Sequence, residues 1–542
     1  MKKVLYYNGS ILTMSKLYPR TEAVLTEDSK ILAIGKLAEL ETLIDEQTER
    51  VDLCGKTLMP AFVDGHSHVV MHGSMLNKCN LSECRSFDEI LSTISDFRIK
   101  NNLVHGEKIS CYGYDLSIIK EGTHPTAAVL DRLGVDNPIG CTHASFHMGV
   151  YNTVAMKAAG IDDSYTFVGS GVVGRDTNGK LNGYFEEGAR RVMSDFMSKG
   201  CNESFSDNFL RAQECYLKNG ITTIQDGGNV KESKLENYRV LAESGKIIAD
   251  IVLYLEPRLK DTTFWQRALS IIGKETYKNH VKIGGVKMVL DGSPQAKTAW
   301  MSEPYVGEQE YRGYPNLKDE TVYAVLKKGI AENMQVLAHC NGDAAAEQYL
   351  TAWERIVTEE PDAKNLRPVM IHAQTVRYDQ LNRIAQNGMV CSFFVGHCYY
   401  WGDTHLKNFG RSRGSRISPI RAAMDRKVPL NFHQDSPVTQ PNMLHSIWCA
   451  VNRMTRSGNV IGEENRVEVY DALIAATNGG AYTYFEEATK GILAAGAVAD
   501  LIILDNDPTA IDPMKIKDIK VLRTIKDGRV VYSVENYCAK II

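Results

Sequence analysis

The sequence has no long apolar run, no paired-cysteine motif and no excess of positive charge. No stretch approaches the length that a transmembrane helix needs. The apolar run after Lys2 and Lys3 ends after four residues, which is too short for the core of a signal peptide. The twelve cysteines are scattered without a Cys-x-x-Cys pair, so we expect free thiols rather than a disulfide framework. These absences predict a cytoplasmic protein without a membrane anchor.

The charge balance excludes a second group of functions. The net charge of −4 and the pI near 6.4 offer no basic surface for nucleic acid or for an anionic membrane. We therefore expect neither of these partners, whereas a small-molecule substrate and a homo-oligomer are both compatible with the sequence. Hydrophobic residues make up 44% and charged residues 24% of the chain, as in ordinary globular proteins. A length of 542 residues predicts two or three domains.

Both ends of the chain are rich in short strand-like segments separated by turns. Examples are 4–7 before Asn8-Gly9, 30–35, and 499–504. Because chain termini often lie close together, we expect residues 1–58 and 488–542 to build one composite β-sandwich.

The middle of the chain, residues 59–487, alternates apolar runs with amphipathic stretches, which is typical of an α/β protein with parallel strands. Eight strand-like runs separated by helical ones predict a (β/α)8 TIM barrel with an insertion at about 100–215. The eight runs are 58–63, 220–225, 249–255, 286–290, 335–338, 369–372, 389–394 and 428–432.

The first of these runs leads into Asp64-Gly65-His66-Ser67-His68. On an extended strand, residues two apart point to the same side, so both imidazoles would project together. Neutral imidazole is a common ligand of zinc and related divalent metals. His66 and His68 therefore predict one half of a metal site.

Other strand-like runs also end in metal-binding or acid–base residues. His339 and His372 end two runs, and the last run is followed by His433-Gln434-Asp435. Functional groups of such barrels gather where the strands end. The sequence therefore predicts metal ligands at His66, His68, His339 and His372, with Asp435 beside them.

Lys287 lies among apolar residues of the run before Asp291. A buried ammonium is costly unless it is neutral or paired. Reaction with CO2 would make Lys287 a carbamate that bridges two divalent metals, most simply zinc. Two metals can share a hydroxide, and Asp435 would then be the general acid/base. The alternative is a salt bridge from Lys287 to Asp291 or Glu187.

Four further residues are weaker candidates for substrate contacts. Glu187 follows a turn and either stabilises a helix start or contacts metal or substrate. His147 and His397 would shape the pocket or the core. Trp401, with the tyrosines before it, indicates an apolar or aromatic substituent on the substrate.

The motifs described above, in the order in which they occur along the chain, resemble the amidohydrolase superfamily. Within it they resemble the branch of N-substituted formamide deformylases and exoenzyme regulatory proteins. The resemblance covers nearly the whole chain. It rests on 23–35, 60–68, 183–189, 286–292, 339–343, 371–374, 400–403, 435–437 and 490–508. It implies a metal-bearing barrel with a β-sandwich that hydrolyses C–N bonds of amides, formamides or related compounds. The implied metal ligands are His66, His68, His339 and His372, with carboxylated Lys287, and Asp435 is the acid–base residue.

Two other functions are compatible with the same residues. The first is a mononuclear zinc deaminase of an amino-substituted ring, with Glu187 as proton shuttle and no carboxylated lysine. The second is a non-catalytic, metal-binding regulatory protein. His433-Gln434 replaces the small residues that the resemblance leads us to expect before Asp435.

Overall fold

The computed structural model describes residues 2–144, 146, 148–169, 171–199, 204–261, 263–535 and 540–541. The chain divides into two compact units, Met1–Val69 with Phe209–Ile542, and Val70–Asn208. No helix among the described residues is both long enough and apolar enough to cross a membrane.

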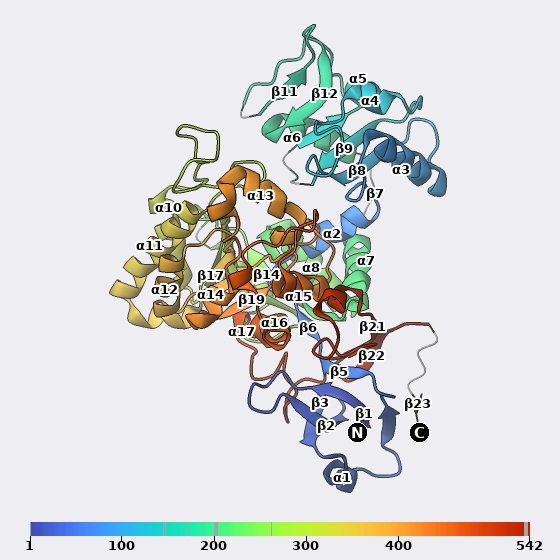
Figure 1. The fold of residues 1–542 in the computed structure, drawn as a ribbon, viewed down its shortest axis with the longest axis vertical. Helices are drawn as coiled ribbons and strands as arrows, with labels where there is room; N and C mark the ends of the chain where they lie inside the picture. Colours follow the sequence, from blue (N-terminus) through green and yellow to red (C-terminus); the bar gives the residue numbers. More distant parts are fainter. Residues whose placement is uncertain are drawn as a thin grey trace. The chain divides into compact units, whose positions relative to one another are not determined.

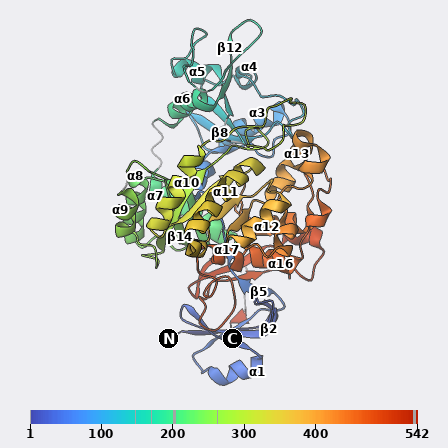
Figure 2. The same ribbon diagram turned by 90° about the vertical axis from the view of Figure 1, so that its left-hand side faces the viewer.

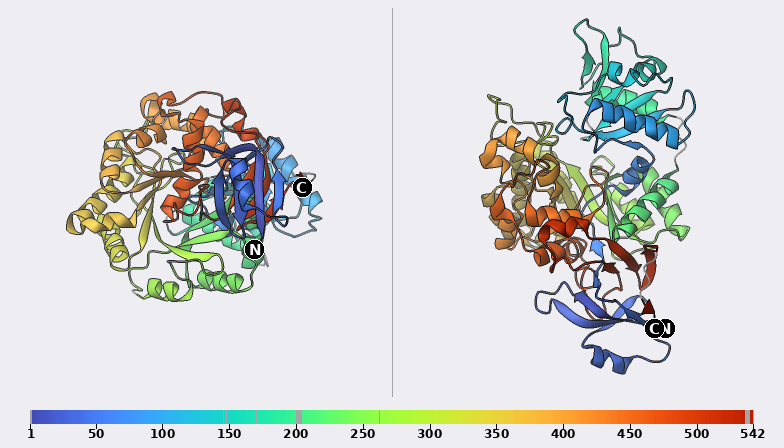
Figure 3. Two further views of the ribbon diagram at one scale, coloured as in Figure 1. Left: turned by 90° about the horizontal axis from the view of Figure 1, so that it is seen from below. Right: turned by 45° about the vertical axis from the view of Figure 1, so that its right-hand side comes forward.

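Eight strands of the first unit form a parallel sheet in chain order. Figure 3 shows this sheet from below, with its strands surrounded by helices. The two edge strands meet at their carboxyl ends, because the Gly65 N–H donates to the Phe432 carbonyl at 3.2 Å. The sheet thus curls as in a TIM barrel. Its strands are β6 (Phe62–Val63), β13 (Ile221–Val230), β14 (Asp250–Leu255), β15 (Val281–Val289), β16 (Gln335–Cys340), β17 (Val369–His372), β18 (Val390–Phe393) and β19 (Leu430–Phe432).

Helices follow the strands along the chain, as the alternation of apolar and amphipathic segments predicts. Their buried faces carry apolar residues at helical spacing, such as Val322, Val325 and Leu326 of α10. Figure 2 shows α10, α11 and α12 side by side. The helices are α8 (Glu232–Glu243), α9 (Phe264–Ile271), α10 (Asp319–Ala331), α11 (Asp343–Glu359), α12 (Tyr378–Gln386), α13 (Gly396–Gly414), α14 (Ile420–Asp425), α15 (Met443–Asn452), α16 (Val469–Ala475) and α17 (Asn478–Thr483).

A nine-stranded sheet combines strands from both ends of the chain. Figure 1 shows the N-terminal strands in blue and the C-terminal strands β21 and β22 in red within this part of the unit. The central pairing joins β5 to β20, with Leu58 opposite Ile503. That this sheet forms a β-sandwich stays a prediction. Its strands are β1 (Lys3–Leu12), β2 (Arg20–Glu27), β3 (Lys30–Gly35), β4 (Glu49–Asp52), β5 (Thr57–Pro60), β20 (Leu501–Leu504), β21 (Val521–Lys526), β22 (Arg529–Ser533) and β23 (Lys540–Ile541).

The expected first barrel strand, 58–63, is two strands. Its first part, β5, pairs with β1 and β20 of the nine-stranded sheet, and only β6 pairs with β13 of the barrel. The break falls at Ala61, whose N–H donates to the Asp500 carbonyl. One apolar run therefore contributes a strand to each of two sheets, and every residue of both strands is buried.

The second unit contains a sheet of its own, and the expected insertion of about 100–215 overlaps most of this unit. The sheet order is β11-β12-β10-β9-β8-β7, with a parallel part (β7 to β9) and an antiparallel part. Cysteine thiols and aliphatic side chains pack beneath the parallel part. The elements are α2 (Val69–Leu76), β7 (Cys79–Asn80), α3 (Phe87–Lys100), β8 (Ile109–Tyr114), α4 (Ala127–Asp131), β9 (Ile139–His143), β10 (Met148–Tyr151), α5 (Thr153–Ala158), β11 (Val173–Arg175), β12 (Leu181–Glu186) and α6 (Glu187–Ser198).

Candidate metal centre

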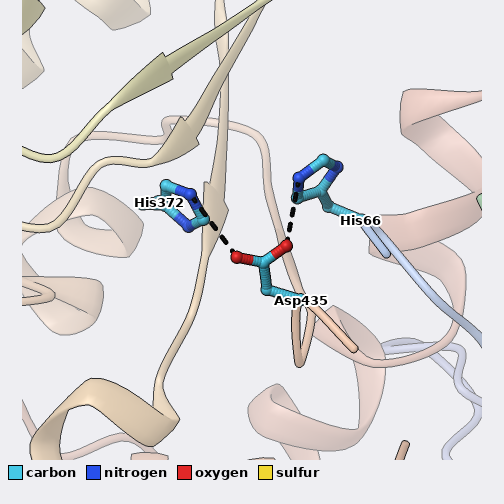
Figure 4. A group of neighbouring side chains, drawn as sticks. All are labelled: His66, His372 and Asp435. Atoms are coloured by element: carbon cyan, nitrogen blue, oxygen red, sulfur yellow. Dashed lines mark ion pairs between the residues drawn. The ribbon is translucent and has the colours of Figure 1, made fainter. Parts of the chain in front are cut away.

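Asp435 lies at the centre of a cluster of histidines at the carboxyl ends of the barrel strands. Its Oδ1 is 3.4 Å from His66 Nε2 and 3.3 Å from His68 Nε2, and its Oδ2 is 3.9 Å from His372 Nε2. Figure 4 shows the carboxylate between the rings of His66 and His372. Three segments far apart in the sequence thus present their donor atoms to one small volume.

The expected geometry of the first histidine pair is wrong in one respect. The strand β6 ends at Val63, so His66 and His68 lie in the segment that follows it rather than on an extended strand. Their rings still converge, with centroids 5.0 Å apart. The segment is fixed by backbone bonds to the loop after β19, because the Asp435 N–H donates to the His66 carbonyl and the His68 N–H donates to Ser436.

His66 is oriented by the neighbouring strand. Its Nδ1 donates to Gln225 Oε1 at 2.6 Å, which leaves Nε2 facing Asp435. Burial, followed by the charge of Lys287, holds the pKa of His66 well below its usual value, so the ring is neutral. A neutral imidazole with one nitrogen already occupied presents the other nitrogen as a metal ligand.

His339 and His372 lie on adjacent strands with ring centroids 4.7 Å apart. The Nδ1 of His339 is 3.0 Å from Asp291 Oδ1. Asp291 is fixed in turn by the backbone N–H groups of Asn341 and Gly342. Burial, followed by His339, holds the pKa of His372 well below its usual value. The His372 ring is therefore neutral, and the His339 ring lies directly beside it.

The backbone at the cluster adopts an unusual conformation. His372 has φ of 72° and Asp435 has φ of 53°, in the left-handed region that side chains other than glycine seldom occupy. Such conformations persist only where the surroundings impose them, and they concentrate at functional sites. The strain therefore supports a functional role for these two positions.

Lys287 points into the same cluster from β15. Its Nζ is 3.2 Å from His66 Nε2, and burial lowers the pKa of the amine to about 8. The alternative salt bridge to Asp291 is not formed, since both oxygens of Asp291 bond to the His339 side chain and to backbone N–H groups. No carboxylate of the described residues lies within 4.0 Å of Lys287 Nζ. A buried amine without a salt-bridge partner is therefore a candidate for reaction with CO2 and for binding a metal ion.

The weaker candidates are placed differently. His397 is the second residue of α13, and its ring centroid is 5.7 Å from that of His372. Trp401 lies one turn further along α13, 5.7 Å from the His397 ring, and both side chains are buried. Glu187 begins α6 and belongs to the second unit, whereas the cluster belongs to the first. His147 lies outside the described residues.

Three residues that position the ligands were not predicted as site residues. Gln225 orients His66, Asp291 orients His339, and His433 bonds to His372 Nδ1 at 3.1 Å. The only signal in the sequence is that each follows or ends an apolar strand-like run. Their roles depend on the alignment of neighbouring strands, which a single sequence does not encode visibly.

The donor set fits a divalent metal ion. One ligand atom each of His66, His372 and Asp435 lies within 4.8 Å of the other two. Imidazole with carboxylate is a combination that zinc and other first-row divalent ions bind well. His68 and Lys287 stand at the edge of the same group. The residues present therefore fit the metal that the histidine pattern predicts.

Glycine at position 227 leaves the room that His66 needs. A Cβ built at Gly227 would lie 2.2 Å from His66 Cε1. We expect Gly227→Ala to displace the His66 ring and to lower metal retention, measured as bound metal after dialysis against a chelator. The matched control is Gly35→Ala, whose added carbon would meet only the movable Glu39 and Leu40 side chains at 3.2 and 3.3 Å. Equal retention in both variants would contradict the placement of His66 at the metal.

Comparison with known proteins places this cluster in a family context. Residues 49–532 match the model described as "Amidohydrolase family". YtcJ of Bacillus subtilis is 26% identical over 98% of this chain and 99% of its own. The N-substituted formamide deformylase of Arthrobacter pascens is 24% identical over 97% of this chain and 98% of its own. A solved metal-dependent hydrolase of Pyrococcus furiosus is 25% identical, with a TM-score of 0.71, over 94% of this chain and 100% of its own.

Proposed function

Because this chain belongs to the amidohydrolase family and is a metal-dependent hydrolase, we propose that it hydrolyses the C–N bond of an amide or an N-substituted formamide. The observation that carries the proposal is the position of Asp435, with its two oxygens between His66 and His372. A similarity to the N-substituted formamide deformylase along nearly the whole chain supports this substrate class.

The proposed metal ligands are His66, His68, His339, His372 and Lys287, with zinc as the proposed ion and two ions per chain. The proposed bridge is Lys287 carboxylated on Nζ, where the neutral amine attacks CO2 and releases one proton. The lowered pKa of the buried amine increases the fraction that can react. Bound divalent ions would lower the pKa of a water molecule and polarise a substrate carbonyl.

Asp435 is the proposed general acid/base. Burial alone would raise its pKa, but His68, His433 and Lys287 more than offset this effect, so the pKa is lowered and the carboxylate is ionised near neutral pH. It can therefore accept a proton from the attacking water. The same oxygen would then deliver this proton to the leaving nitrogen, which departs as an amine.

Side chains of α13, together with Gln374 and Phe394 beside it, are proposed to contact the substrate. The Nδ1 atom of His397 is buried without a hydrogen-bond partner in the described chain, and the Oε1 atom of Gln374 is in the same state. Trp401 and Phe394 provide apolar surface beside His397. Such a wall suits an apolar or aromatic substituent on the substrate. Glu187 and His147 remain predicted substrate contacts.

The domain boundaries are proposed to follow the same division of labour. Residues 59–487 would form the catalytic barrel with its insertion. Residues 1–58 and 488–542 would form a supporting β-sandwich, in line with the sheet that both segments share.

A substrate panel tests the proposal. Protein reconstituted with zinc would be assayed on N-alkyl and N-benzyl formamides, simple amides and amino-substituted heterocycles, with release of formate, amine or ammonia as the readout. We expect turnover of amides or formamides and none of the heterocycles. Ammonia released only from heterocycles would favour a deaminase instead. No turnover of any class by metal-loaded protein would contradict hydrolysis of these bonds.

Carboxylation of Lys287 has its own test. Protein prepared with 13C-labelled bicarbonate should give a carbamate carbon signal in the NMR spectrum. Lys287→Met should lose this signal and bind about half as much metal, because the variant removes the bridge. Lys246→Met changes a lysine outside the candidate metal centre. It serves as the control and should keep both properties. A wild-type spectrum without the carbamate signal would contradict the proposed bridge.

A further inference from the structure

A chain of buried hydrogen bonds connects α17 to His372 through three barrel residues. Thr483 Oγ1 donates to the Gly479 carbonyl at 3.3 Å, and Asn431 Nδ2 donates to Thr483 Oγ1 at 2.6 Å. Ser392 Oγ bonds to Asn431 Oδ1 at 2.6 Å and to His433 Nδ1 at 2.8 Å. The last link joins His433 Nε2 to His372 Nδ1 at 3.1 Å. We refer to this chain as the His433 relay.

The direction of the relay is set at its far end. A backbone carbonyl only accepts, so the hydroxyl proton of Thr483 is committed to Gly479. Thr483 Oγ1 must then accept from the Asn431 amide, which turns the Asn431 oxygen toward Ser392. The Ser392 proton is committed in turn to that oxygen. Ser392 is therefore an acceptor for His433.

The same logic fixes both imidazoles. His433 donates its Nδ1 proton to Ser392, so its Nε2 carries a lone pair. His372 must then donate its Nδ1 proton to His433, which leaves His372 Nε2 bare and facing Asp435. The polar side chains of the relay have 0–3% of their surface exposed, so water does not compete for these bonds.

We propose that His433 is a positioning residue that fixes the tautomer of His372 and so presents His372 Nε2 to the metal. The inference rests on the proposed function, in which His372 is a ligand. Ligand histidines usually donate to a carboxylate, a carbonyl or water, and such partners orient the ring. In this cluster His339 bonds to the carboxylate of Asp291 and His66 bonds to the side-chain carbonyl of Gln225. The partner of His372 is different, because it is the neutral imidazole of His433.

The tautomer is tested on the metal-free protein. Imidazole 15N chemical shifts, assigned with a His372→Gln variant, should show His372 protonated on Nδ1 and bare on Nε2. This measurement needs no substrate and no metal. A wild-type His372 that carries its proton on Nε2 would overturn the proposal. If the tautomer is as expected and the substrate panel shows no turnover, the proposed reaction fails while the relay stands.

Metal affinity provides the second readout. His433→Leu should weaken zinc binding by about 10- to 100-fold, measured by competition with a chelator. His433→Gln should recover most of this loss, because its terminal oxygen can accept from His372. The control is His445→Gln, a half-buried histidine of α15 outside the relay, which should bind zinc as the wild type does. Equal affinity of His433→Leu and wild type would overturn the proposal, and if His433→Leu does not fold, the wild-type tautomer decides it.

Discussion

Asp435→Asn should lower kcat by about 10²- to 10⁴-fold on whichever amide or formamide the protein turns over best, which is the usual contribution of a general acid/base. Asparagine keeps the shape of the side chain and tolerates the left-handed backbone found at this position, where φ is 53°. It cannot accept the proton of the attacking water. The effect should therefore fall on kcat, with the fold and most of the metal content retained.

The measurement combines steady-state kinetics with metal analysis and circular dichroism on the same preparation. Asp425→Asn is the matched control, because Asp425 lies on the exposed end of α14 in a surface pair with Arg421. It should leave kcat and metal content unchanged. Unchanged turnover of the Asp435 variant would remove this residue from the mechanism. If neither the wild type nor the variant turned over any substrate, the result would favour a non-catalytic role for the cluster.

Much of the barrel can be predicted because most of its strands are short, uninterrupted apolar runs. Buried parallel strands are apolar on both faces, so segments such as 249–255 and 369–372 stand out from the amphipathic helices between them. The structure confirms β14 and β17 almost residue for residue. The first run misled the prediction because two different sheets bury it, and burial alone does not say which partner a strand has.

The sheet of the second unit was not predicted. Its strands are short, two to six residues, and its parallel part carries cysteine and tyrosine rather than an aliphatic run. A pattern of this length is not distinguishable from loop by periodicity. The residues of this unit that were expected near the substrate, Glu187 and His147, accordingly remain predictions.

Within the candidate metal centre, residue type was predictable and orientation was not. Histidines at strand ends predict metal binding because imidazole is a strong ligand and strand ends converge. The partners of those histidines come from neighbouring strands. Asp291 was considered only as an alternative partner of Lys287, but the alignment of β15 with β16 brings it to His339 instead.

A buried charge cluster joins the amino-terminal end of β14 to β21 of the nine-stranded sheet and to the segment that precedes β20. Asp250 Oδ2 lies 2.6 Å from Lys490 Nζ and 3.0 Å from Lys526 Nζ, and its Oδ1 lies 2.8 Å from His280 Nδ1. Lys526 also lies 3.3 Å from Asp500. The side chains of Asp250, Lys490 and Lys526 have 3–6% of their surface exposed. Asp250 is thus the carboxylate that the two buried ammonium groups share, while Glu486 also pairs with Lys490 and Asp527 with Lys526.

Asp250→Asn should reduce the free energy of unfolding by about 3–5 kcal/mol, because it leaves two buried lysines without their shared partner. Denaturant and thermal unfolding would measure the loss, with Asp425→Asn as the exposed control that should show no measurable change. A small loss, similar to that of the control, would mean that the remaining groups rearrange to neutralise the lysines. The cluster would then not hold the barrel and the sheet together.

The stability that Asp250 provides should also depend on pH. Burial alone would raise the pKa of Asp250, but Lys490, His280 and Lys526 more than offset it, so the pKa in the folded protein is lowered. A carboxyl whose pKa is lower when folded binds fewer protons in the folded state, so its contribution is present above the unfolded pKa of about 3.9. The contribution falls as pH decreases toward the folded pKa. The difference in unfolding free energy between wild type and Asp250→Asn should therefore be constant from neutral pH to about pH 5 and shrink below about pH 4. A difference that stayed constant in acid would show that the ion pairs do not stabilise the folded state.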